Sequence, residues 1–352
     1  MTEMNHRKLG RTGLDVGIIG LGTEHIPWEA DVLDRILGMA VDAGVNYADL
    51  LFIEPEYWEM FTPVLKPYRD KLIAAVHWGG GPTYNLTYSQ RCFDDVLARL
   101  SNGYADVAMM TMVDTENKWR GWAQSSIERL QGYQEQGRVG YIGLSTHVEG
   151  VAVQAAESGL IDVLMFPFNL TSHATPQVQE VYRACTENDV GLVAMKVYRG
   201  GTLLVQQRKP TGITPAQCLA YVLSLPVSTT VPGPKDADQF AETLHYLTAT
   251  EQEQAYGVLL EDVSRYLTGE CTSCEHCLPC PEEIHISAVV HLTDWAGWAD
   301  PESDEGAEVR LTYGALPVKA SACIECGVCE ERCPFAVEIM ARMQKAVSIF
   351  GV

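Results

Sequence analysis

The sequence lacks the features that place a chain at a membrane or on nucleic acid. Its longest apolar runs, such as VAMMTMV at 107–113, are far shorter than the ~18–20 residues of a membrane-spanning helix. Positive charge is scarce, since 25 Lys and Arg stand against 46 Asp and Glu, a net charge of −21. Because phosphates and anionic lipids bind basic surfaces, the composition predicts neither a nucleic-acid partner nor membrane association.

A secretion signal and a disordered composition are also missing. The N-terminal stretch MTEMNHRKLG is polar and contains no apolar core of a signal peptide, which predicts a cytoplasmic protein. Hydrophobic residues make up 47% and charged residues 20% of the 352 residues, which is typical of globular chains. The length is sufficient for one large domain and a small one.

Eight short apolar runs punctuate residues 16–234. They are continuous rather than alternating, as expected for parallel strands buried on both faces of a sheet. Helix-length segments separate several of them, for example residues 29–44, which end on the C-cap signal Gly44. The eight predicted strands are 16–23, 45–50, 71–78, 107–114, 139–146, 162–169, 190–197 and 228–234.

Eight such units in about 250 residues predict an α/β fold, the (β/α)8 TIM barrel. A doubly wound open sheet is the alternative, but it favours a Gly-rich phosphate turn after its first strand, and GLGTEH at 20–25 has His25 at the third glycine position. We expect the barrel at 1–248, a connecting helix with Thr250 as N-cap at 249–270, and a small domain at 271–352. Within that domain we expect a solvated acidic loop at 300–308 and a packing helix at 338–350.

Cysteines are concentrated at the end of the chain. Eight of the 11 lie between residues 271 and 333, whereas Cys92, Cys185 and Cys218 are scattered and predicted to be core residues. A disulfide scaffold is typical of small secreted proteins, so a metal site is the better interpretation of the eight. The run CIECGVCEERCP at 323–334 has the spacing of a bacterial ferredoxin that holds a [4Fe–4S] cluster.

The run CTSCEHCLPCP at 271–281 is similar but one residue shorter before its Cys-Pro. In this spacing the fourth cysteine of each run ligates the other cluster. Zinc is the alternative, although four-thiolate zinc sites use two pairs rather than two triplets. We therefore predict a ferredoxin-like domain with two [4Fe–4S] clusters, which carries electrons rather than merely stapling the fold. The predicted ligands are Cys271, Cys274, Cys277 and Cys333 for one cluster, and Cys323, Cys326, Cys329 and Cys280 for the other.

The barrel segment resembles the aldo-keto reductase superfamily. The resemblance rests on HRKLGRTGLDVGIIGLGT (6–23), AVDAGVNYADL (40–50), GRVGYIGLST (137–146), GLVAMKVYRGGTL (191–203) and VPGPKDADQFAE (231–242). With the cysteine tail, the chain from about residue 6 to 340 resembles the iron–sulfur subgroup of that superfamily. The resemblance implies the barrel, the clusters and a redox activity.

The family's Asp-Tyr-Lys-His tetrad is only partly present. Asp49 matches the aspartate, but Glu54, His77 and Thr111 occupy the positions of the tyrosine, lysine and histidine. Tyr57 takes the tyrosine's role if the loop differs. Lys196 ends an apolar strand, where an ammonium needs a partner or a substrate, and Asp49 is one such partner. The predicted catalytic residues at the C-terminal ends of the strands are Asp49, Glu54, His77 and Lys196.

For a nicotinamide the resemblance implies Ser145 and Asn169, whereas Thr146 and Met165 replace the other usual residues. Gly233 and Lys235, in VPGPKD, occupy the family's phosphate-binding region at a helix N-terminus. The C-terminal ends of the strands form the mouth of the barrel. For each polar residue there, His25 and His147 included, an ordinary structural role is the alternative.

Three functions follow. The first is an oxidoreductase, suited to anaerobic conditions, that passes electrons through two clusters to or from a small-molecule substrate or cofactor at a rebuilt barrel mouth. The second is a non-catalytic electron-transfer subunit that docks on a redox partner protein. The third is an NAD(P)H-dependent carbonyl reductase, which the loss of the family's lysine disfavours.

Overall fold

A computed structural model gives the fold and describes residues 4–51, 54–79, 85–206, 209–261, 268–271, 276–297, 301–302 and 304–352. These residues form two compact units. The first contains the described residues up to Leu259, apart from Thr171–Gln177. That segment groups with the second unit, which contains the described residues from Leu260 onward.

Eight parallel strands form one sheet in the first unit, in the spatial order β12-β9-β8-β7-β6-β5-β4-β3. Its two edges are joined, because the Gly20 amide donates to the Thr230 carbonyl (2.7 Å) and the Thr230 amide donates to the Ile18 carbonyl (3.0 Å). The sheet is therefore the predicted barrel, and all eight strands are confirmed. They are β3 (Leu21–Gly22), β4 (Tyr47–Leu50), β5 (Ile73–Trp78), β6 (Ala105–Met110), β7 (Val139–Ser145), β8 (Val163–Pro167), β9 (Gly191–Met195) and β12 (Thr229–Thr230).

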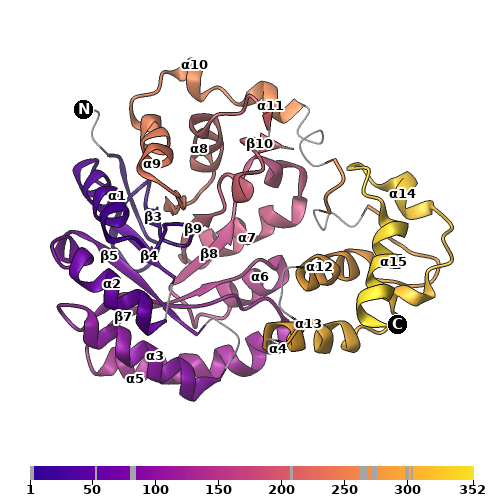
Figure 1. Ribbon diagram of the computed structural model, residues 1–352, viewed down its shortest axis with the longest axis horizontal. Helices are drawn as coiled ribbons and strands as arrows, with labels where there is room; N and C mark the ends of the chain where they lie inside the picture. The colour runs from indigo at the N-terminus through magenta and orange to yellow at the C-terminus, as the bar shows by residue number, and fades with distance from the viewer. Residues whose placement is uncertain are drawn as a thin grey trace. The chain divides into compact units, whose positions relative to one another are not determined.

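Helices alternate with these strands and surround the barrel (Figure 1). They bury their apolar stripes against it, as α1 does with Leu33, Ile36 and Leu37, and the predicted Gly44 cap has a φ of +84°. The helices are α1 (Ala30–Asp42), α2 (Pro55–Leu65), α3 (Leu86–Arg99), α4 (Glu116–Lys118), α5 (Gln124–Glu135), α6 (Glu149–Glu157), α7 (Pro176–Glu187), α8 (Pro215–Ser224) and α9 (Ala237–Leu244). A small hairpin, β10 (Val205–Gln206) with β11 (Lys209–Pro210), precedes α8.

An N-terminal hairpin closes the end of the barrel opposite the mouth. It consists of β1 (His6–Lys8) and β2 (Asp15–Gly17), and its turn places Leu9 in the barrel interior with Tyr47, Val107 and Val193. Gly10 forms a bridge to Val190, next to the start of β9. Since the N-terminal ends of the strands are filled, the C-terminal ends remain for chemistry.

The predicted connecting helix is wrong in its described part. Two short helices, α10 (Glu251–Gln254) and α11 (Gly257–Glu261), are separated by Ala255, whose backbone is extended. Thr250 is the N-cap of α10 as predicted, in a capping box with Glu253. Residues 262–267 of the predicted helix lie outside the described residues.

The second unit consists of α12 (Ile286–Ala296), α13 (Asp304–Ala315), α14 (Val328–Arg332) and α15 (Ile339–Phe350). The predicted packing helix is confirmed as α15, which buries Ile339 and Met343 and stacks Phe350 on Tyr313 at 3.9 Å between ring centroids. The predicted acidic loop is wrong from residue 304 on, because those residues begin α13. Among the described helices, none has the length and apolarity to cross a bilayer.

Candidate functional site

Three strands of the barrel bring Asp49, His77 and Thr111 together at their C-terminal ends. His77, near the end of β5, has Nε2 2.9 Å from Oδ1 of Asp49 in β4. Its Nδ1 lies 2.8 Å from the hydroxyl of Thr111, which follows β6. The exposed fractions are 7% for Asp49, 1% for His77 and 2% for Thr111, so a buried chain of hydrogen bonds links the three strands.

The partners of Thr111 determine the direction of its hydrogen bond with His77. Thr111 donates its single hydroxyl hydrogen to the Gly79 carbonyl 2.9 Å away, so it accepts the hydrogen of His77 Nδ1. Nε2 then faces the Asp49 carboxylate, which accepts a hydrogen bond when ionised. The ring of His77 therefore lies between a carboxylate and a hydroxyl, and it stands at the position that the family's lysine takes in the resemblance.

Tyr57 lies beside this pair. It belongs to α2, is 1% exposed, stacks on Phe61 at 5.0 Å and meets Trp28 edge-on at 5.4 Å. Burial raises the pKa of Tyr57 well above its usual value and the charge of Asp49 raises it further, while the side chain of Thr23 opposes the rise. The structure therefore places a protonated phenol near Asp49, three residues after the position at which the family's spacing puts it.

The other two predicted catalytic residues do not join the chain. Glu54 is partly buried and lies at the N-terminal boundary of α2. Lys196 is exposed and follows β9 with a φ of 54°. Among the described residues its ammonium forms no ion pair with Asp49, whose partner is His77. Of the two alternatives for Lys196, the ion pair with Asp49 is therefore not found, and its role toward a substrate stays a prediction.

The predicted nicotinamide and phosphate residues have other partners. The Ser145 hydroxyl accepts from the amide of Met112 (2.9 Å), and the Asn169 amide group lies 3.4 Å from the Lys196 carbonyl. Lys235 precedes α9, whose N-cap Asp236 accepts from the Gln239 amide. The phosphate-binding role of Gly233 and Lys235 stays a prediction.

Gly233 lies against His25, which is exposed beside Glu24. His25 is therefore a rim residue rather than part of the buried chain.

A second buried carboxylate, that of Asp114, is not among the predicted site residues. Asp114 binds His147 Nδ1 (2.9 Å), the His147 amide (2.7 Å) and the Thr146 hydroxyl (3.0 Å). Burial acts to raise the pKa of Asp114, but His147 and then Lys118 outweigh it and hold the pKa at about 2. The signal was available, because Asp114 is the only carboxylate at the end of the run predicted as a strand at 107–114.

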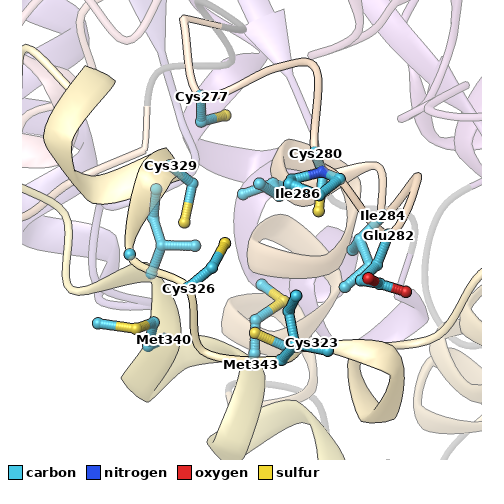
Figure 2. A pocket seen from close by; sticks show the side chains of 14 residues that line it. Cys277, Cys280, Glu282, Ile284, Ile286, Cys323, Cys326, Cys329, Met340 and Met343 are labelled. Atoms are coloured by element: carbon cyan, nitrogen blue, oxygen red, sulfur yellow. The ribbon is translucent and has the colours of Figure 1, made fainter.

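The second unit gathers cysteines around two neighbouring pockets. The first, about 400 Å³ with part of it open to solvent, is lined by Cys280 and by Cys323, Cys326 and Cys329. Figure 2 shows these four side chains around a common space. The second, about 330 Å³, is lined by Cys271 and Cys333. Cys277 lines both pockets, and Cys274 lies outside the described residues.

These pockets differ from a site for a single ion. Within the part of the chain that the structure describes, no three His, Cys, Asp or Glu side chains are arranged to hold one metal ion. A zinc site needs all its sulfurs about 2.3 Å from one point, whereas a [4Fe–4S] cube takes one thiolate on each iron. The apolar walls, including Ile284, Ile286 and Met343, and the soft thiolates fit such a cube.

The three upstream cysteines are core residues, as predicted. Cys92, Cys185 and Cys218 are 5%, 1% and 0% exposed. Burial raises the pKa of Cys185 and of Cys218 to about 12, so both are inert thiols at neutral pH.

The fold and the mouth define a (β/α)8-barrel protein with acid–base residues at the C-terminal ends of its strands. The sequence profile of the Aldo/keto reductase family matches residues 14–217, and the chain belongs to this family of oxidoreductases. The match ends before the cysteine runs, so membership concerns the barrel.

Known proteins agree with this assignment. The chain is 24% identical over 178 residues to the uncharacterized oxidoreductase YqkF of Bacillus subtilis (strain 168); the match covers 47% of this chain and 57% of that protein. It is similar in fold to an aldo-keto reductase of Bacillus halodurans in its holo form, with a TM-score of 0.60, 20% identity, and coverage of 72% of this chain and 94% of that one. For the apo form the values are 0.56, 19%, 72% and 94%.

Proposed function

We propose that the protein is an iron–sulfur oxidoreductase that acts on a small-molecule substrate at its barrel mouth. One observation carries the proposal: each pocket combines cysteines of both runs. Cys280 lies with Cys323, Cys326 and Cys329, whereas Cys333 lies with Cys271. The grouping of Cys323, Cys326 and Cys329 with Cys280 matches the crossed ligation expected from ferredoxin spacing, whereas a zinc ribbon takes two cysteines from each run.

In this proposal the cysteines and the mouth residues have different roles. The cysteines hold the clusters, which supply or accept single electrons when bound. At the mouth, the hydrogen-bonded Asp49–His77 pair lies next to Tyr57. The raised pKa of Tyr57 keeps its hydroxyl protonated until negative charge develops on a substrate oxygen, to which it donates the proton. His77 uses both ring nitrogens for Asp49 and Thr111, so it positions Asp49 rather than transferring the proton itself.

The cluster content tests the proposal directly. Protein purified without oxygen is expected to contain about eight irons and about eight sulfides per chain. Cys280→Ala and Cys333→Ala each remove a ligand of a different pocket and are expected to lose about half of the iron. Cys185→Ala, a buried cysteine of the barrel unit, is the matched control and keeps the full content. Stoichiometric zinc, or a chain without iron, would contradict the proposal.

The mouth is tested in the same preparation. Tyr57→Phe and His77→Gln are expected to abolish reduction of a substrate found with a low-potential donor, while the visible absorption of the clusters stays intact. Lys196→Gln, at an exposed position, is expected to retain the rate. If the clusters are present and all three variants turn over as the wild type does, the assignment of Tyr57 and His77 to the reaction is wrong. Intact clusters without turnover of any substrate by the wild type would instead favour an electron carrier that docks on a partner enzyme.

A second candidate is an NAD(P)H-dependent carbonyl reductase, favoured by the family and by the position of Tyr57 near Asp49. His77 then stands at the position of the family's lysine. Titration with NADPH, followed by tryptophan fluorescence, tests it. Saturable binding that Tyr57→Phe preserves, with loss of turnover, would establish this activity. Absence of binding at millimolar cofactor would exclude it.

A further inference from the structure

The two cysteine pockets differ in their exposure. The pocket of Cys271 and Cys333 is walled by Val290, Phe335 and Val337, which are 0%, 4% and 3% exposed. At the pocket of Cys280, Cys326 is exposed and Ile324 has an exposed fraction of 60%. The Cys280 pocket, called the open pocket below, therefore presents an exposed thiol and an exposed apolar side chain at its rim.

The rim of this open pocket is acidic. Glu282 lines the pocket, and Glu283, Glu325 and Glu331 are exposed in the two segments that form it. Segments 276–285 and 321–333 together contain five glutamates and a single cation, Arg332. The guanidinium of Arg332 binds the Pro279 carbonyl (3.1 Å), which keeps it beside the chain rather than above the pocket.

Two of the five carboxylates have partners within the unit. Glu330 accepts from the Met340 amide (2.8 Å), and Glu325 accepts from the Gln344 side chain (2.7 Å). These bonds fix the carboxylates without neutralising them. Apart from the cysteines, the remaining ionisable side chains of the segments are those of the exposed histidines His276 and His285. The field at the rim is thus negative, and bound sulfides and thiolates make it more so.

We infer that this face, defined by Ile324, Cys326, Glu282, Glu325 and Glu331, docks a redox partner protein that presents a basic patch. The inference rests on the proposed function, since it requires a cluster in the open pocket. Ile324 provides the apolar contact at the centre, and the carboxylates provide a charged rim that steers the partner. A second copy of this chain does not fit, because it has a net charge of −21 and is repelled.

The location serves electron exchange. An electron passes only over a short gap, and Cys326 both lines the open pocket and is exposed at the surface. The electron lost by one protein is gained by the other, and no bond is formed or broken. The pocket of Cys271 shares Cys277, Ile286 and Ile339 with the open one, which places it next in line.

The experiment compares two charge-matched double variants of the full chain, loaded with iron and sulfide. Glu282→Lys with Glu331→Lys reverses two charges at the rim. Glu128→Lys with Glu157→Lys reverses two exposed charges on α5 and α6 of the barrel unit and is the control. The probes are a basic c-type cytochrome and an acidic flavodoxin. Affinity is measured by calorimetry at several salt concentrations, and the reduced protein's reaction with each probe is followed by stopped flow.

The wild type is expected to bind the basic cytochrome at low salt and to reduce it faster than the acidic flavodoxin. The rim variant is expected to lose about tenfold in affinity and in association rate, while the control loses less than about twofold. Added salt should remove the difference between the two variants. Ile324→Ser is expected to accelerate dissociation while leaving the salt dependence unchanged.

Equal losses in the two double variants would overturn the inference, because they would reflect the overall charge rather than a face. Equal binding of the acidic probe would overturn it as well. Iron and sulfide analysis separates this failure from that of the proposed function. With full cluster content only the docking face is refuted, whereas a chain without iron refutes both.

Discussion

At the scale of single residues, the centre of the mouth is His77. The sequence predicted Asp49 and His77 as neighbours, because both end strands of one parallel sheet. It did not predict their bond, nor that Thr111 completes the chain. The positions of Tyr57 and Lys196 were also open, since they depend on where a loop and a strand end. Met112 and Lys196 both have positive φ values, 50° and 54°, and neither residue type signals that conformation.

The first prediction concerns the Asp49–His77 pair. His77→Leu leaves the buried carboxylate of Asp49 without its hydrogen-bond partner and is expected to lower the free energy of unfolding by about 3–5 kcal/mol. Asp49→Asn in the same background removes that charge, so the double variant is expected to recover part of the loss. Urea unfolding at pH 7, followed by tryptophan fluorescence, measures the cycle. Additive losses in the double variant would show that the two side chains are not coupled.

Asp114 provides a pH-dependent prediction. Its pKa is lowered from the ordinary value of 3.8 to about 2, so the carboxylate stabilises the fold above pH 3.8. This contribution of about 2 kcal/mol is lost as the pH falls from about 4 to about 2. Asp114→Asn is therefore expected to be less stable than the wild type at pH 7, with the gap narrowing toward pH 3. A gap that stays constant over that range in urea unfolding would contradict the assigned ion pair with His147.

At the scale of elements, the apolar runs of the sequence predicted which segments form strands more accurately than they predicted where each strand ends. β6 ends at Met110 and β9 at Met195, four and two residues before the apolar runs end. In both places a residue with positive φ, Met112 or Lys196, follows within two residues of the strand end. The connecting helix failed for a related reason, since a capping box ensures a helix start at Thr250 but does not determine its length.

The N-terminal hairpin gives a prediction for an element. A Cβ at Gly10 would lie 2.3 Å from the Gly191 nitrogen, so Gly10→Ala forces the hairpin away from β9. We expect a loss of about 3 kcal/mol in unfolding free energy, from backbone conformation and crowding together. Gly13, which also has a positive φ but no atom within 4 Å of an added Cβ, is the control, with an expected loss of about 1 kcal/mol. Similar losses in thermal or urea unfolding would show that the hairpin is not held by this contact.

At the scale of the whole molecule, the two units have different sources of stability. The barrel has an interior filled by side chains of its strands and closed by Leu9. The core of the second unit is smaller, and the cysteines are part of it. Cys277 belongs to the buried cluster, and Cys280, Cys323 and Cys333 pack against it. Small cores of this kind usually need a metal or a disulfide, which is why the cysteines bear on folding as well as on electron transfer.

Removal of iron should therefore affect one unit. Treatment with a chelator under reducing conditions is expected to leave the cysteine pockets as cavities in the second core, so amide protection falls in α12, α14 and α15. The strands β4 to β9 are expected to keep theirs, because their hydrogen bonds and interior contain none of these cysteines. Hydrogen exchange with mass spectrometry measures both regions in one sample, and a mock-treated sample is the control. Unchanged protection in α12 and α15 would show that the cysteines hold no group on which the unit depends, and a parallel loss in the barrel strands would show that the two cores unfold as one.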